Sequence, residues 1–237
     1  MGSLVAELAE KLSSATNSID FDEQTLFLNT SANTVGVGTN APASKFDVRG
    51  TMQVGVDDTG YDVKFFGDTA SSYMEWDTSA MELEIRGPDT VAGKLLLSTA
   101  DPSIVDGNKL GQIDFQAPLE NTGSTTADQR LVGASIWAEA DATFSATVNE
   151  TDLVFATGAS EVAAEKLRID STGHTTPGAD NTQDLGSASK RWKNIYTTDL
   201  HLANERGNWT VIEEEDYLTL RNNKTDKVYK LVMEEIE

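Results

Sequence analysis

The stretch Met81-Glu82-Leu83-Glu84-Ile85-Arg86 alternates between apolar and charged residues. Successive side chains of an extended strand point to opposite faces, so this stretch predicts a β-strand with one apolar and one charged face. The same alternation recurs in residues 134–140, 209–211 and 218–220. Further strands are predicted at 45–48, 63–66, 73–77, 94–98, 113–117, 153–157, 166–170 and 228–233.

Polar turns separate these predicted strands, as at Gly87-Pro88 and Asn222-Asn223. Short strands at regular spacing with polar turns indicate an all-β chain. Many strand positions carry Ala, Ser or Thr, which would leave a single-chain sandwich thinly packed. We therefore expect an all-β protein with a short N-terminal helix. It should form an elongated trimeric fibre of short antiparallel strands, which could be intertwined between chains.

The expected helix lies at the N-terminus, where apolar residues recur at alternating spacings of three and four. This is the a/d pattern of a coiled coil. Two to three heptads are too short to be stable alone in water, so the helix needs partner chains or a docking groove. One amphipathic helix packed on its own domain would give the same pattern. The residues expected to trimerise or dock are Val5, Leu8, Leu12, Ala15 and Ile19.

Composition suggests four parts. Residues 1–22 form the helical anchor or coiled coil, and residues 23–170 form the main β-rich region. Residues 171–184 form a polar joint rich in Gly, Thr and Pro, and residues 185–237 form a C-terminal β module.

The chain is strongly acidic, with 18 Lys+Arg against 39 Asp+Glu and a formal net charge of −21. Such a surface repels phosphate backbones and anionic membranes, so neither nucleic acid nor membrane insertion is expected. The chain has no cysteine, which excludes disulfides and thiol chemistry. The N-terminal residues lack the basic start and apolar run of a signal peptide, so we expect synthesis in a cytoplasm without export by that route.

Two glycine-rich stretches resemble nucleotide-binding motifs only in outline. Residues 36–41 fit G-x-G-x-x-A, but that motif must open a helix. Here Pro42 and a predicted strand follow instead. Residues 87–94 have one residue too many between their glycines for a phosphate-binding loop, and Leu95 stands where a hydroxyl is required. We expect no nucleotide cofactor.

Catalytic and metal sites are also not expected. Only two histidines, His174 and His201, are present, too few for a closed zinc site within one chain. Three copies of His201 about a threefold axis could hold a metal, although an ordinary surface histidine is the simpler interpretation. With 39 acidic residues, a close pair of carboxylates arises by chance and does not indicate a glycosidase.

Three stretches resemble segments of tail-fibre and related virion proteins of tailed bacteriophages, those of marine phages especially. The first is residues 34–50 (TVGVGTNAPASKFDVRG). The second is residues 64–69 (KFFGDT) followed by YMEWD at 73–77. The third lies within residues 184–210 and includes DLGS, RWKNIY and DLHL.

The resemblance implies a non-enzymatic homotrimer located in the virion. Its expected role is a short tail or baseplate fibre in host-surface attachment, bound to other virion proteins through its N-terminus and to a host-surface receptor beyond. A head fibre or capsid decoration protein is the alternative within this class. A polysaccharide depolymerase spike would need a longer, less interrupted β-helix, and a cellular adhesin would need an export signal.

Overall fold

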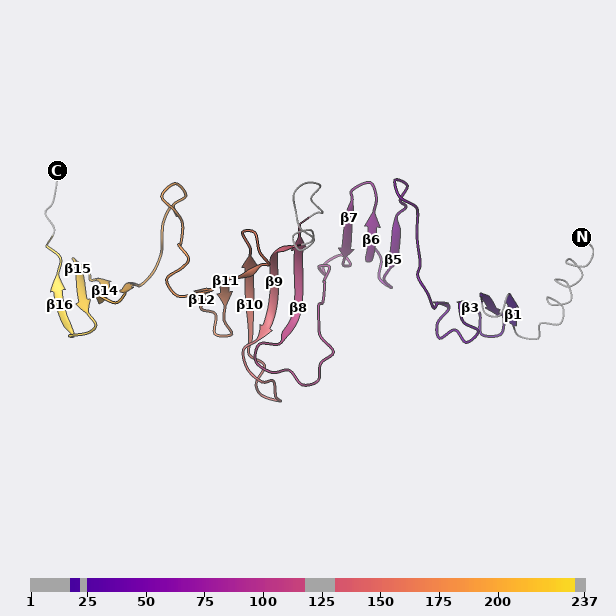
Figure 1. The fold of residues 1–237 in the computed structure, drawn as a ribbon, viewed down its shortest axis with the longest axis horizontal. Coiled ribbons are helices and arrows are strands. Elements are labelled where there is room, and N and C mark those ends of the chain that lie inside the picture. Colours follow the sequence, from indigo (N-terminus) through magenta and orange to yellow (C-terminus); the bar gives the residue numbers. More distant parts are fainter. Residues whose placement is uncertain (1–17, 22–24, 118–130, 233–237) are drawn as a thin grey trace, which may run out of the picture. The chain divides into compact units, whose positions relative to one another are not determined.

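The computed structural model describes residues 18–21, 25–117 and 131–232. Over these residues all regular structure is β-strand, and the strands form four open sheets (Figure 1). The all-β prediction is therefore confirmed for the described residues. The chain divides into two units, Met1–Leu96 and Leu97–Glu237, each holding two of the sheets.

The first sheet has the order β1-β2-β3-β4. Its strands are β1 (Ser18–Phe21), β2 (Leu26–Asn29), β3 (Thr34–Val37) and β4 (Phe46–Val48). Asn29 ends β2 and accepts hydrogen bonds from two backbone amides of the following turn, at 2.9 and 3.1 Å. Strands β3 and β4 pair in parallel, whereas the other pairs are antiparallel.

The glycine pair of residues 36–41 shapes the connection between β3 and β4. Gly38 has a φ of 71°, which L-residues rarely adopt. A Cβ on Gly36 would lie 2.2 Å from the backbone oxygen of Thr39. The glycines thus permit a tight loop between two strands. The next element after them is strand β4.

The C-terminal end of the expected N-terminal helix must be corrected. Ile19 lies in strand β1, where its backbone pairs with Leu28. The physical reason is that a neighbouring strand offers these residues a full antiparallel ladder, and β-branched isoleucine favours extended backbone. Residues 1–17, which carry the rest of the predicted helix, lie outside the described residues.

The second sheet is the antiparallel meander β5 (Val63–Phe66), β6 (Tyr73–Asp77) and β7 (Glu82–Arg86). The predicted bounds of β5 and β6 are confirmed. Strand β7 begins one residue after the predicted start because Met81 has a φ of 57° and belongs to the turn. The side chain of Asp77 holds this turn by accepting hydrogen bonds from the amides of Ser79 and Ala80.

The third sheet is the largest, with the order β12-β11-β10-β9-β8, and it forms a single layer (Figure 1). Its strands are β8 (Lys109–Gln116), β9 (Val132–Ala140), β10 (Thr151–Thr157), β11 (Ala164–Ile169) and β12 (Thr175–Pro177). Trp137, Val154 and Ala156 form a small buried cluster on one face, with Ala163 packed against it.

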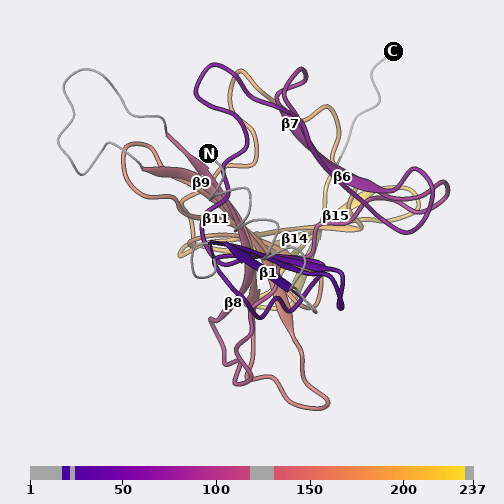
Figure 2. The same ribbon diagram turned by 90° about the vertical axis from the view of Figure 1, so that its right-hand side faces the viewer.

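The fourth sheet, antiparallel throughout, has the order β13-β14-β15-β16. Its strands are β13 (Asp199–Ala203), β14 (Asn208–Glu213), β15 (Leu218–Asn222) and β16 (Lys227–Lys230). Trp209 and Tyr229 approach with ring centroids 5.7 Å apart. Figure 1 labels β14, β15 and β16 of this sheet near the C-terminus, and Figure 2 labels β14 and β15.

The strand predicted at residues 94–98 is wrong. The segment forms no ladder with any described strand. Leu97 contacts the backbone side of Gly111 so closely that a Cβ there would lie 2.7 Å from the Leu97 Cβ. The Leu97 backbone oxygen lies 3.0 Å from the same position, but residues 94–98 form no backbone hydrogen bond with another described residue. Leu95 and Leu96 are exposed.

Candidate assembly surfaces

Each of the four sheets has one face made largely of apolar side chains that nothing described in the chain covers. Residues paired across antiparallel strands point to the same face, so the register identifies the members of each face. Among the described residues only six hydrophobic side chains are buried: Phe27, Ile104, Trp137, Ala140, Val154 and Ala156.

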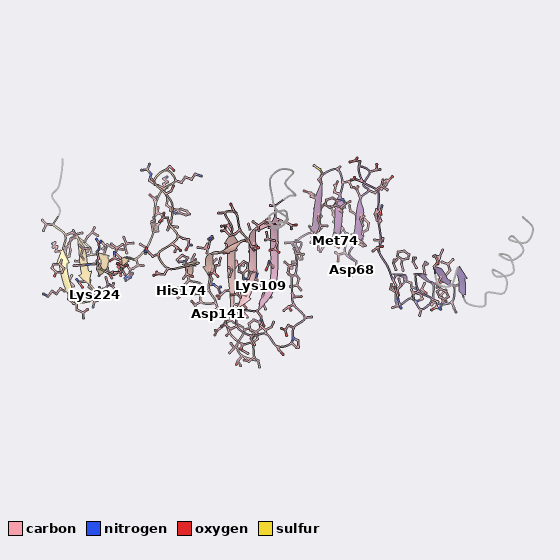
Figure 3. All side chains as sticks on the ribbon, in the orientation of Figure 1. Asp68, Met74, Lys109, Asp141, His174 and Lys224 are labelled. Carbon is pink, nitrogen blue, oxygen red and sulfur yellow. The ribbon has the colours of Figure 1, made fainter. Side chains whose placement is uncertain are left out.

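The sheet β5–β7 shows the pattern most clearly. Val63 pairs with Trp76 and Trp76 pairs with Leu83. The neighbouring row on this face has the same arrangement, because Met74 pairs with both Phe65 and Ile85. Met74, on the central strand β6, is labelled in Figure 3. The exposed fractions of Phe65 and Leu83 exceed one half, at 54% and 57%. The apolar face of this sheet is Val63, Phe65, Met74, Trp76, Leu83 and Ile85.

The opposite face of the same sheet is polar, and its side chains form ion pairs and hydrogen bonds within the chain. Lys64 pairs with Glu75 at 2.6 Å, and its ammonium lies 4.0 Å from the ring centroid of Tyr73. The hydrogen bond to Glu75 raises the pKa of Lys64. The Tyr73 hydroxyl donates to Glu84 at 2.7 Å and accepts from Arg86 at 3.2 Å. This face is suited to water, whereas the apolar face is not.

The apolar face of sheet β8–β12 lies opposite its small buried cluster. Ile113 pairs with Ile136, which pairs with Phe155. Phe155 pairs in turn with Leu167. Five of the large side chains on this face are at least 36% exposed. Those five are Ile113, Phe115, Leu153, Leu167 and Ile169.

The remaining two sheets repeat the arrangement. In β13–β16, Leu200 pairs with Val211, which pairs with Leu220 and then Tyr229. Leu202 pairs with Trp209 in the neighbouring row of the same face. In β1–β4 the apolar face contains the described side chains Leu26, Leu28, Val35, Val37, Phe46 and Val48.

The face of sheet β8–β12 that carries the small buried cluster also contains a network of charges centred on Arg168, which pairs with Val154 across the strands. Its guanidinium pairs with Glu139 at 3.0 Å, with Glu165 at 2.8 Å and with the Asp152 carboxylate. Hydrogen bonds to Glu165 raise the pKa of Arg168, and bonds to Asp152 and Glu139 act in the same direction. Asp152 is 2% exposed and also accepts a hydrogen bond from the amide of Ser171. No sequence pattern links these residues, and sequence reasoning missed them.

The two histidines do not gather at a shared site. His201 lies on the polar face of its sheet, where its Nδ1 is 3.0 Å from the hydroxyl of Thr210. His174 lies in an exposed turn, where its amide donates to Asp170. The searched part of the chain, residues 18–21, 25–117 and 131–232, holds no group of three His, Cys, Asp or Glu placed to bind a metal. Over the same residues no helix has the length and apolarity to cross a membrane.

Of the residues predicted to trimerise or dock, Val5, Leu8, Leu12 and Ala15 lie outside the described residues. Ile19 belongs to strand β1, and not to a helix. Their role stays a prediction. The uncovered sheet faces are candidate assembly surfaces separate from the predicted helix. Sequence alternation indicates the apolar side of each strand, but it does not show which strands pair to form one face.

No family model matches this chain, and no curated protein matches it. Two solved structures of the carboxy-terminal domain of the bacteriophage T5 L-shaped tail fibre resemble part of it. The structure that includes the intramolecular chaperone domain is 18% identical, with a TM-score of 0.38, over 52% of this chain and 35% of that chain. The other is 20% identical, with a TM-score of 0.37, over 50% of this chain and 43% of that chain. Each match spans less than half of the solved chain, and a likeness of this size carries no functional assignment.

Proposed function

We propose that this chain is a non-enzymatic structural subunit of a bacteriophage particle that assembles as a homotrimer by covering its apolar sheet faces with apolar side chains of other copies. The observation that carries this proposal is the uncovered apolar face on each of the four sheets. Burying apolar surface contributes about 25 cal/mol per Å². A sheet that leaves this surface in water lacks that contribution to its stability.

The placement of charge supports covering by copies of the same chain. On β5–β7 the charges gather on one face, where Lys64 pairs with Glu75 and Arg86 donates to the Tyr73 hydroxyl, and the other face carries no charge. A chain of net charge −21 repels its own copies through charged surfaces. Its uncharged faces are therefore the surfaces through which copies meet at the lowest electrostatic cost.

The motifs shared with tail-fibre proteins supply the biological context of this proposal. We infer a short tail or baseplate fibre, with the N-terminal residues bound to other virion proteins and the outer loops presented to a host-surface receptor. Three copies present each loop three times, so weak contacts with a receptor gain through multivalency.

The test is the mass of the purified full-length protein by light scattering at micromolar concentration. The proposal expects three times 25.6 kDa, about 77 kDa. A mass of 25.6 kDa with native β-sheet content would overturn it. Immunogold labelling of phage particles with an antibody against this chain then tests the location. Absence of label from intact particles would contradict the virion assignment.

A further inference from the structure

The segment 185–197 combines exposed apolar side chains with an excess of positive charge. Trp192 is 62% exposed, Ile195 68% and Tyr196 91%. The segment contains three cations and no acidic residue, within a chain whose acids outnumber its bases by more than two to one. The three cations are Lys190, Arg191 and Lys193.

The backbone of this segment is also left without partners. Ser187 and Lys190 form a turn through two mutual backbone hydrogen bonds. From 191 to 197 the structure gives no backbone hydrogen bond to any other described residue. The side-chain bonds here are local, such as Asn194 to the Tyr196 hydroxyl at 3.2 Å. Backbone groups that are neither in a ladder nor in a turn are free to accept a partner strand.

A second exposed cluster, of opposite charge, lies at the turn between β14 and β15. Glu213, Glu214, Glu215 and Asp216 are consecutive and exposed. None of them forms an ion pair with a described residue. Glu213 pairs with Leu218, so it lies at the rim of the apolar face of β13–β16. The sheet therefore has an apolar face next to an acidic turn, and the segment 185–197 has aromatic side chains next to cations.

We propose that residues 185–197 form an arm that docks on the sheet β13–β16 of a second copy of this chain. The arm lays Trp192, Ile195 and Tyr196 against the apolar face of that sheet. It also brings its three cations opposite the acidic turn at 213–216. This inference rests on the proposed assembly of several copies and names one contact within it.

The register places the two elements at the same end of the sheet. The arm leads directly into β13, whose first residue, Asp199, pairs with Ile212, next to the acidic turn. In a rotationally symmetric assembly the acidic turns of all copies lie at the same level along the axis. Each arm therefore leaves its own sheet at the level of its neighbour's acidic turn.

The contact contributes a useful share of an interface. Aromatic side chains bury roughly 150–250 Å² each, and a stable interface buries roughly 800 Å² per partner. Trp192 and Tyr196 alone supply up to about half of that area on one side. The ion pairs add specificity and weaken with salt, because exposed charges are screened.

The absence of cysteine permits a direct test in the full-length protein. The double variant Lys193→Cys/Glu215→Cys is treated with a short thiol-to-thiol cross-linker and run on a denaturing gel, beside each single variant. Linked species of two and three times the chain mass, formed by the double variant alone, are expected. Species that stay at the single-chain mass would overturn the arm.

Light scattering on the same sample separates this inference from the proposed function. A trimer without linked chains contradicts the arm and leaves the assembly intact, whereas a monomer contradicts both. Amide hydrogen exchange gives an independent readout, because docking must slow exchange at 191–197. Reversing the arm's charges (Lys190→Glu/Arg191→Glu/Lys193→Glu) should remove that slowing, and free exchange in the unaltered trimer would contradict docking.

Discussion

The sheets β5–β7 and β8–β12 have the same single-layer construction but differ in what the chain itself stabilises. Sheet β8–β12 buries Trp137, Val154 and Ala156 on one face and fixes Arg168 among three carboxylates. None of the buried hydrophobic side chains belongs to sheet β5–β7. The larger sheet has a core of its own, whereas the smaller sheet depends on what covers it.

This difference separates folding from assembly. Damage to the Arg168 network should lower the stability of one sheet within each chain. Damage to the apolar face of β5–β7 should prevent copies from associating and should leave that sheet without the cover on which it depends, while the Arg168 network stays intact. Substitutions at the two places should therefore give different kinds of defect.

The largest effect is expected for Trp76→Asp. It places a charge at the centre of the apolar face of β5–β7, and an unpaired buried charge costs about 3–5 kcal/mol in each copy. The trimer should be lost, with light scattering returning the mass of one chain. Glu82→Lys, on the exposed polar face of the same sheet, is the matched control and should assemble normally. Equal behaviour of the two variants would contradict the account.

Arg168→Met should have the next largest effect. It leaves Asp152, Glu139 and Glu165 without their shared cation, one of them buried. Removing one partner of a buried pair costs about 3 kcal/mol. The thermal midpoint should fall, as measured by circular dichroism at neutral pH, while the trimer persists at low temperature. Arg221→Met, which removes an exposed pair with Asp226, should change stability by less than about 1 kcal/mol.

The smallest effect concerns the turn after β11. Hydrogen bonds from the Thr172 hydroxyl and from the His174 amide lower the pKa of Asp170 to about 2, from 3.8. A lowered pKa stabilises the fold above pH 3.8, and this stabilisation is lost as pH falls through about 2. Titration of the Asp170 carboxyl by NMR should show this midpoint. Thr172→Val should move it toward 3.8, and an unchanged midpoint would refute the assigned cause.

Sequence alternation predicted much of the fold for a clear physical reason. Strands β5 to β7 combine alternating side chains with strong turn residues, so their bounds follow from local chemistry. Residues 94–98 have the same apolar character but no described neighbour to pair with, and they form no strand. The pattern of residues 26–29 predicts no strand, because two leucines and a phenylalanine suit several local structures; pairing with β1 and β3 determines the outcome.

The candidate surfaces were only partly accessible from sequence. The alternation of residues 81–86 indicates their apolar side. That this side shares a sheet face with Val63 and Trp76 follows only from the strand register. The Arg168 network joins residues from three strands and leaves no local signal. The basic arm and the acidic turn can each be read in the sequence, but their relation depends on which end of β13–β16 they occupy.

Thiol labelling at Met74 tests the covering of the apolar faces most directly. Met74→Cys places the protein's only thiol at the centre of the β5–β7 face, and Asp68→Cys places one in the preceding turn (Figure 3). The account predicts that Cys at 68 reacts rapidly with a soluble maleimide. Cys at 74 should react only after the trimer is dissociated. Equal labelling rates at the two positions in the intact protein would show that the face is open to solvent and would contradict the account.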